Sequence, residues 1–158
     1  AAASPRVRRL AFGAGDFLLD MGLSPTREEG EIAPARAEVV LASRAAGLEP
    51  PLDTVWFDLK DPDGCRLAAM RAKAAGFQGK MCIHPDHVTV ANAVFSASEA
   101  EVAWSRRVVA AFADAERRGL ASIQLEGQFI DYPVMRRAER VLAADAKVGK
   151  SGPKKETA

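Results

Sequence analysis

The stretch LAFGAGDFLLDMG, residues 10–22, joins a short apolar run to two glycines and an aspartate. The apolar residues predict a buried strand over residues 7–13, and Gly13 and Gly15 then leave the backbone beside Asp16 free of side-chain bulk. Proteins of the α/β class bind ligands at the carboxyl ends of their parallel strands. We therefore expect the Asp16 carboxylate at a ligand-binding edge. The alternative is that Asp16 only caps the following turn.

Helices and strands alternate after this stretch. Apolar residues recur at helical spacing over residues 33–47 and 61–76, and a glycine stands at the end of each segment. The runs DTVWFD (53–58) and GKMCIHP (79–85) are typical of buried strands. The resulting βαβαβ order requires parallel strands joined by right-handed crossovers, so the predicted fold class is α/β.

The segment over residues 61–76 carries Leu67, Met70 and Ala74 at this helical spacing. Three parallel strands cannot bury both faces of their sheet alone. We therefore expect the sheet to pair with further sequence or with another copy of the chain.

Beyond Pro85 the sequence becomes mainly helical. A short helix is predicted over residues 85–95, and a longer one opens at Ser98 with a capping box completed by Glu101. A small hairpin or an extended turn around Gly127 follows over residues 122–131, and a last helix has Pro133 in its first turn.

The predicted organisation has three parts. Residues 1–95 carry the parallel sheet, residues 96–146 form a helical segment, and residues 147–158 form a polar, basic tail that is expected to be disordered.

The composition argues against several classes of binding partner and cellular location. The 158 residues carry a net charge of only +1, which gives no general attraction to nucleic acid or to an anionic membrane. No apolar run approaches the roughly 20 residues of a membrane span. Cys65 and Cys82 lack CxxC spacing and follow no visible signal peptide, which favours a reducing cytoplasm. Because Ala1 stands where a start methionine would, we expect a piece of a longer protein.

Three side chains are candidates for chemistry. Asp16 offers a hard oxygen ligand of the kind that Mg²⁺ prefers, and such a metal polarises carbonyl groups and stabilises enolates. His84, before Pro85, could orient a substrate or transfer protons, or it could be a structural histidine at a tight turn. Asp131 could be a general acid or base on a segment that folds over a site, or the N-cap of the last helix.

Other polar groups receive no catalytic role. His87 is expected on a helix surface, and the acidic runs REEGE (27–31) and KDPDG (60–64) are expected in solvated loops, although Asp58 and Asp61 could support a ligand site. Cys82 is expected in the core.

Four segments in the same order resemble the C-terminal half of the citrate lyase beta subunit-like family, within the HpcH/HpaI aldolase superfamily. They are LAFGAGDFLLDMG (10–22), DTVWFDLKDPDGC (53–65), GFQGKMCIHPDHV (76–88) and EGQFIDYPVMRRAERVL (126–142). This superfamily includes malyl-CoA and citramalyl-CoA lyases. The resemblance implies a (β/α)8 TIM barrel, of which this chain would supply the sixth to eighth strands together with a C-terminal helical lid.

The resemblance also implies a site. Asp16 matches a magnesium-binding aspartate, and the backbone at Gly15 matches the part that receives the carboxylate of a 2-oxo acid. Asp131 matches a catalytic aspartate on the lid that transfers a proton in the site of a neighbouring subunit, within a trimer or hexamer. His84 would have a supporting, substrate-binding role near the coenzyme A entrance. The metal-binding Glu and substrate-binding Arg of the family would precede Ala1.

The implied activity is a magnesium-dependent carbon-carbon lyase that splits an acyl-CoA thioester, such as malyl-CoA or citramalyl-CoA, into a 2-oxo acid and a shorter acyl-CoA. Two alternatives stay open: a thioesterase that uses the same site to hydrolyse a malyl-CoA-like thioester, and a non-catalytic assembly module of a larger lyase complex.

Overall fold

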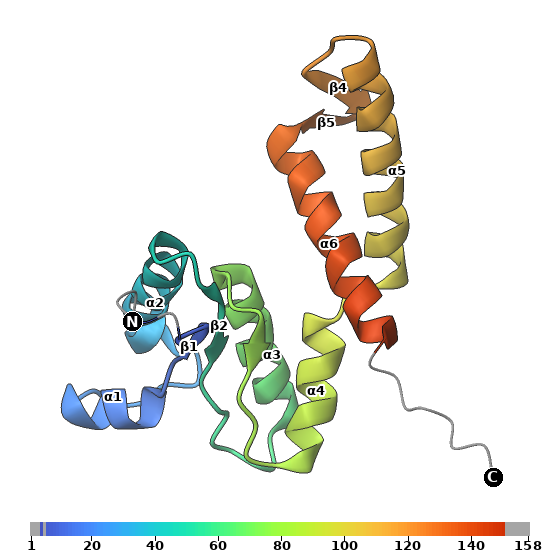
Figure 1. The fold of residues 1–158 in the computed structure, drawn as a ribbon. Helices are drawn as coiled ribbons and strands as arrows, with labels where there is room; N and C mark the ends of the chain where they lie inside the picture. The colour runs from blue at the N-terminus through green and yellow to red at the C-terminus, as the bar shows by residue number, and fades with distance from the viewer. Residues whose placement is uncertain (1–3, 5, 151–158) are drawn as a thin grey trace. The chain divides into compact units, whose positions relative to one another are not determined.

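The computed structural model describes residue 4 and residues 6–150, and the chain divides into two compact units (Figure 1). The first unit is Ala1–Phe95 and the second is Ser96–Ala158. Within the described residues, none of the helices has both the length and the apolar character that a membrane crossing requires.

The first unit contains a parallel sheet with the strand order β1-β2-β3. Its strands are β1 (Arg9–Ala11), β2 (Glu49–Asp53) and β3 (Gly79–Lys80). Both strand pairs are parallel, which confirms the predicted α/β class and strand direction. The carboxyl ends of all three strands therefore lie at one edge of the sheet.

The second strand lies earlier in the sequence than predicted. Only Asp53 of the expected strand over residues 53–58 belongs to β2, which instead contains Pro50 and Pro51. Proline lacks the amide proton but keeps its carbonyl group. The Pro51 carbonyl accepts a hydrogen bond from the Gln78 amide at 3.0 Å. The strand is therefore still paired on this side, although it contains two prolines.

Helices flank the strands of the first unit (Figure 1). They are α1 (Ala14–Asp20), the short 3-10 helix η1 (Gly30–Ile32), α2 (Ala33–Ala45), α3 (Pro62–Ala75) and α4 (Pro85–Phe95). Helix α4 has the predicted bounds. Helix α3 starts where the Asp61 side chain accepts a hydrogen bond from the Gly64 amide at 2.9 Å, and ends at Gly76, whose φ of 105° favours glycine.

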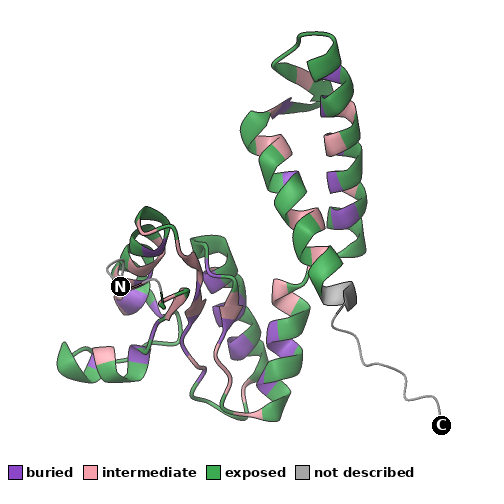
Figure 2. Ribbon diagram, viewed as in Figure 1, coloured by how far each residue is buried: buried purple, intermediate pink, exposed green. Residues whose placement is uncertain are grey.

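The apolar residues whose spacing predicted α3 do not form its buried side. Leu67, Met70 and Ala74 are exposed, and the buried side of the helix carries small residues (Figure 2). These are Gly64, Cys65, Ala68, Ala69 and Ala72. Small side chains let a helix approach its neighbours closely: a Cβ on Gly64 would lie 2.4 Å from the Trp56 ring. Close packing of small residues, which hydrophobic spacing does not weigh, therefore sets the orientation of α3.

The second unit pairs two long helices through a hairpin. It contains α5 (Glu99–Arg117), β4 (Ser122–Leu125), β5 (Gln128–Asp131) and α6 (Tyr132–Lys150). The Ser98–Glu101 capping box is present as predicted. The hairpin turns at Glu126 and Gly127, both with positive φ, as a two-residue turn of this kind requires.

The core of this unit lies between the two helices and the hairpin. It is built on Val108, Phe112, Ile130 and Ala138. Helix α6 continues to Lys150. Residues 147–150 are therefore helical, whereas they were predicted to belong to a disordered tail. Residues 151–158 lie outside the described residues.

Candidate functional site

Asp16 lies in the first turn of α1, directly after β1 and at the edge where the strands end. Its side chain is exposed and lines a concave surface of about 490 Å³ with Phe17, Leu19 and Asp20. Gly13 is the N-cap of α1, and no side chain caps the helix. The capping alternative for Asp16 is therefore wrong, and its carboxylate makes no hydrogen bond or ion pair with any residue that the structure describes.

Backbone contacts with the end of β2 fix the position of α1. The Ala14 amide donates a buried hydrogen bond to Thr54 Oγ1 at 3.1 Å, which satisfies one of the free amides at the start of the helix. A Cβ on Gly15 would lie 3.2 Å from the Phe57 ring. Glycine at this position therefore allows the first turn of α1 to lie close to the loop that follows β2.

A cavity of about 290 Å³ lies at the same edge of the sheet. Apolar side chains such as Leu18, Ile32 and Trp56 line it together with polar side chains such as Thr26 and Glu29. The cavity and Asp16 are thus presented by the segments that follow β1 and β2, which is where the sequence places a ligand.

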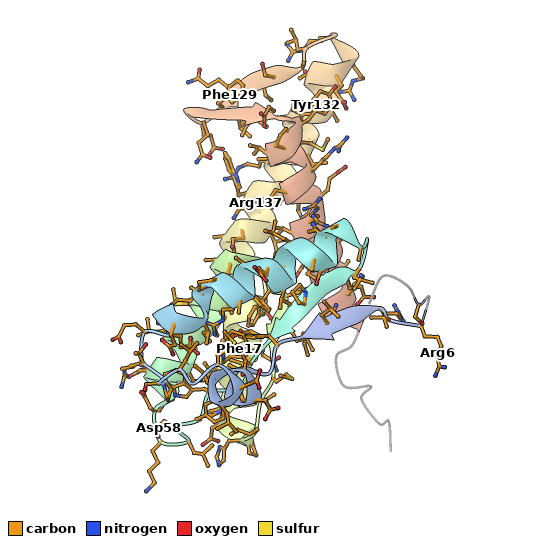
Figure 3. All side chains as sticks on the ribbon, turned by 90° about the vertical axis from the view of Figure 1, so that its left-hand side faces the viewer. Arg6, Phe17, Asp58, Phe129, Tyr132 and Arg137 are labelled. Carbon is orange, nitrogen blue, oxygen red and sulfur yellow. The ribbon has the colours of Figure 1, made fainter. Side chains whose placement is uncertain are left out.

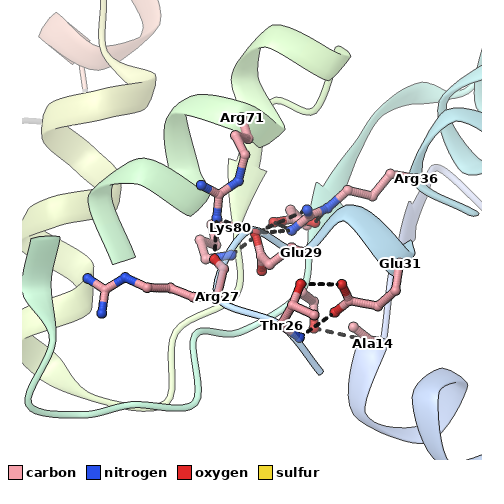
Figure 4. A network of polar contacts seen from close by, with 10 residues as sticks. Ala14, Thr26, Arg27, Glu29, Glu31, Arg36, Arg71 and Lys80 are labelled. Atoms are coloured by element: carbon pink, nitrogen blue, oxygen red, sulfur yellow. Dashed lines mark hydrogen bonds and ion pairs between the residues drawn. The ribbon is translucent and has the colours of Figure 1, made fainter. Parts of the chain in front are cut away.

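A buried ion network joins the ends of β2 and β3 to α2 (Figure 4). Asp53, with 0% exposure, accepts two hydrogen bonds from the Arg36 guanidinium, at 2.8 and 2.9 Å, and one from Lys80 Nζ at 2.9 Å. Such a fork-shaped pair fixes both position and orientation. The carboxylate of Asp53 therefore holds a helix and a neighbouring strand to the end of β2.

Glu29 extends this network toward α3. Its carboxylate lies 3.1 Å from Arg36 and 3.0 Å from Arg71, and its exposure is 7%. The expectation that residues 27–31 form a solvated loop is therefore wrong for Glu29, because two arginines compensate its charge inside the unit. Its φ of 54° lies in the left-handed region, where a residue other than glycine is uncommon.

Asp53, Arg36 and Glu29 were not predicted as residues of this region. Hydrophobic spacing treats Arg36 as a surface residue of α2, although it is 4% exposed and its partners are 7 and 17 residues away. One available signal was Asp53 itself, a charged residue at the start of the apolar run DTVW.

Local charges shift two pKa values in this region. Burial lowers the pKa of Arg36, but Asp53 and Glu29 outweigh burial and raise the pKa above its ordinary value. For Glu31, burial raises the pKa, and the hydrogen bonds that Thr26 donates bring it below its ordinary value. Arg36 and Glu31 are thus held in their charged forms.

His84 follows β3 and shapes the entry to α4. Its Nδ1 accepts a hydrogen bond from the Asp86 amide at 3.3 Å, and its carbonyl accepts one from the His87 amide at 3.1 Å. This is the geometry of the structural alternative. His87 was expected on the surface but is 1% exposed, and neither of its ring nitrogens has a hydrogen-bond partner among the described residues.

Asp131 is the last residue of β5 and belongs to the second unit. Its Oδ1 accepts a hydrogen bond from the Val134 amide at 3.2 Å and so caps the start of α6, as the structural alternative predicts. The residue is half-buried, and Oδ2 makes no hydrogen bond or ion pair within the described part of the chain. One carboxylate oxygen is thus committed to the helix.

Both cysteines are free thiols: Cys65 is buried, whereas Cys82, which was expected in the core, is only half-buried. Burial raises the pKa of both Cys65 and Cys82. Neither residue has the lowered pKa of a reactive thiolate.

Among the described residues, no group of three or more His, Cys, Asp and Glu side chains is arranged to hold a metal ion. Asp16 would therefore contribute one ligand only. A single unpartnered carboxylate on a concave surface fits Mg²⁺, which keeps several waters and needs only one or two protein carboxylates.

The parallel strands and the helices between them define an α/β protein, a class in which ligands bind at the carboxyl edge of the sheet. Residues 1–85 match the model of the HpcH/HpaI aldolase/citrate lyase family. The chain belongs to this family.

Curated relatives and a solved structure agree with this assignment. The chain is 37% identical to a citrate lyase subunit beta-like protein of Deinococcus radiodurans, over 90% of this chain and 50% of the relative. It is 34% identical to the L-malyl-CoA/beta-methylmalyl-CoA lyase of Rhodobacter capsulatus, over 95% of this chain and 52% of the relative.

The solved structure is that of CitE from Mycobacterium tuberculosis in complex with magnesium, acetoacetate and coenzyme A. It matches with a TM-score of 0.75 and 31% identity, over 92% of this chain and 54% of that chain. The chain thus spans about half the length of the proteins that it matches.

Proposed function

We propose that this chain is the C-terminal half of a magnesium-dependent carbon-carbon lyase that acts on an acyl-CoA thioester, such as malyl-CoA or citramalyl-CoA. The observation that carries the proposal is the exposed Asp16 carboxylate at the strand edge, which no described side chain neutralises. The 31% identity to a structure that holds magnesium, acetoacetate and coenzyme A supports the choice of ligands.

Each site residue has a distinct role in this proposal. Asp16 is a magnesium ligand, and the backbone at Gly15 receives the carboxylate of the 2-oxo acid. His84 supports the loop near the coenzyme A entrance, in keeping with its hydrogen bond from the Asp86 amide. A second metal-binding carboxylate and a substrate-binding arginine would complete this site.

Asp131 is the proton-transfer residue. In the cleavage direction, the hydroxyl group gives its proton to solvent as its carbon becomes the carbonyl carbon of the 2-oxo acid. The electron pair of the broken carbon-carbon bond passes to the acyl α-carbon as a thioester enolate. Asp131 in its acid form then delivers a proton to that carbon and is reprotonated from solvent. A bound magnesium ion would supply the positive charge that holds the 2-oxo acid.

The proposed assembly is a (β/α)8 barrel to which the second unit adds a lid. In a trimer or hexamer the lid would present Asp131 to the site of a neighbouring subunit. The proposed location is the cytoplasm, in keeping with the free thiols of Cys65 and Cys82.

The test is Asp16→Asn in the whole protein, with Asp63→Asn as the matched control. Asp63 is an exposed aspartate in the first turn of α3 and thus shares the setting of Asp16 without its proposed role. We expect Asp16→Asn to abolish magnesium-dependent turnover and to weaken Mg²⁺ binding measured by calorimetry, while the control binds Mg²⁺ normally. Unchanged Mg²⁺ affinity in Asp16→Asn would remove the basis of the proposal.

A further inference from the structure

Three arginines share one exposed face at the start of α6. Arg136, Arg137 and Arg140 are all exposed, and with Tyr132 and Pro133 they line a concave surface of about 520 Å³. The helical repeat turns the three arginines away from the buried Ala138, while the Tyr132 ring at the start of this face packs against Phe112. Figure 3 shows Tyr132 at the start of α6 and Arg137 further along the same helix.

These arginines form no ion pair with any residue of the described part of the chain. The other helix of the unit behaves differently: Arg107 pairs with Glu126, and Arg117 and Arg118 both pair with Asp114. Even Glu139, on α6 itself, makes no ion pair with its arginine neighbours among the described residues.

The arrangement costs the helix some stability. Arg136 and Arg140 are four residues apart on a helix, where like charges repel each other. Arginines without a carboxylate partner on a concave surface are typical of sites for phosphate, because the guanidinium fork matches two phosphate oxygens at once. The charge of this face therefore predicts an anionic ligand.

The position of the face suggests which anion. The helix starts next to Asp131, and the arginines follow it along the helix, Arg140 at about 13 Å from Asp131 by the rise of 1.5 Å per residue. Coenzyme A has a matching layout: its pantetheine arm separates the reacting thioester from a diphosphate and a ribose 3′-phosphate. A thioester at Asp131 would thus direct its phosphates along the same surface.

We propose that Arg136, Arg137 and Arg140 bind the phosphate groups of the acyl-CoA substrate. This inference rests on the proposed function, because it requires Asp131 to meet the thioester end of the same molecule. It adds a second task to the lid, which then holds the nucleotide end of the substrate as well as transferring the proton.

The experiment measures the Kd of coenzyme A by calorimetry in the whole protein. The variants are Arg136→Ala, Arg137→Ala and Arg140→Ala, made singly and together, with Arg106→Ala as the matched control. Arg106 is an exposed arginine on α5 that forms no ion pair with a described residue and lies outside the concave surface. We expect the triple variant to bind coenzyme A about tenfold or more weakly, since exposed charge-assisted bonds contribute modestly, and the control to bind it normally.

Dephospho-coenzyme A, which lacks the 3′-phosphate, identifies the phosphate group that is bound. If the arginines hold the 3′-phosphate, the unsubstituted protein binds dephospho-coenzyme A more weakly than coenzyme A, whereas the triple variant binds the two ligands equally. If they hold the diphosphate, the triple variant loses affinity equally for both ligands. The KM of the acyl-CoA should rise in parallel while kcat changes little.

Two results would overturn the inference and leave the proposed function intact. One is an unchanged Kd of coenzyme A in a folded triple variant that retains lyase activity. The other is a triple variant whose oligomeric state changes while its intact oligomers bind coenzyme A with an unchanged Kd. That result would show that the arginine face is a contact between copies of the chain. By contrast, an unsubstituted protein that binds no coenzyme A would contradict the proposed function itself.

Discussion

The two carboxylate oxygens of Asp131 have different surroundings. Oδ1 accepts the Val134 amide and caps α6, whereas Oδ2 has no partner among the described residues. A cap needs only a hydrogen-bond acceptor, but proton transfer needs an ionisable group. The structural and catalytic roles of Asp131 are therefore compatible, and a substitution can separate them.

Asp131→Asn in the whole protein should separate the two roles. Asparagine caps helices as well as aspartate does, so thermal stability should hardly change. Because the amide cannot transfer the proton, kcat should fall by about a hundredfold or more, which steady-state kinetics with an acyl-CoA substrate would measure.

Ser98→Ala is a control that should change stability and leave turnover unchanged. It removes the capping box of α5, so the free energy of unfolding should drop by about 1 kcal/mol, with kcat unchanged. Full activity in Asp131→Asn would show that Asp131 is a helix cap and nothing more.

At the scale of the elements, charged side chains join helices to strands where apolar contacts alone would not fix their orientation. Arg36 from α2 and Lys80 from β3 meet on Asp53 of β2, and Glu29 adds Arg71 of α3. These residues lie at the same strand edge as Asp16. The network therefore supports the part of the first unit that carries the candidate site.

Asp53→Asn should strongly destabilise the protein. It removes the negative charge that compensates two buried cations, and breaking a buried ion pair in this way costs about 3–5 kcal/mol. Urea unfolding of the whole protein, followed by circular dichroism, would measure the loss.

The matched control is Glu49→Gln on the same strand. Glu49 is half-exposed and pairs with Arg8 and Arg9, so its loss should cost no more than about 1 kcal/mol. Equal effects of the two substitutions would show that burial of the network adds nothing to stability.

At the scale of the whole molecule, the candidate residues are divided between two units. Asp16, Gly15 and His84 belong to the first unit and Asp131 belongs to the second. A reaction that needs both Asp16 and Asp131 must bring the units of one chain, or of two chains, to a common site.

Mixing Asp16→Asn and Asp131→Asn subunits tests the second arrangement. If the lid acts on a neighbouring subunit, a mixed oligomer contains sites with both native aspartates, and part of the activity should return. The measurement is lyase turnover of co-expressed subunits carrying different affinity tags, purified over both tags. An inactive mixed oligomer would mean that each lid serves its own chain.

The sequence determined the features that depend on local chemistry. It predicted the parallel α/β class, the bounds of α4, the capping box at Ser98 and the hairpin around Gly127, because a short motif or a regular repeat specifies each of these. It also placed Asp16 after the first strand, since an apolar run followed by glycines marks the strand end.

Only the tertiary structure decided which side chains are inside. Three features depend on partners far away in the sequence. They are the hydrogen bonding of β2 despite its prolines, the packing of the small residues of α3, and the burial of Glu29, Arg36 and His87. A charge or a proline can be buried when a distant group compensates it, and no local pattern records that compensation. The same reason explains why the sequence predicts the place of the candidate site but not the ion network beside it.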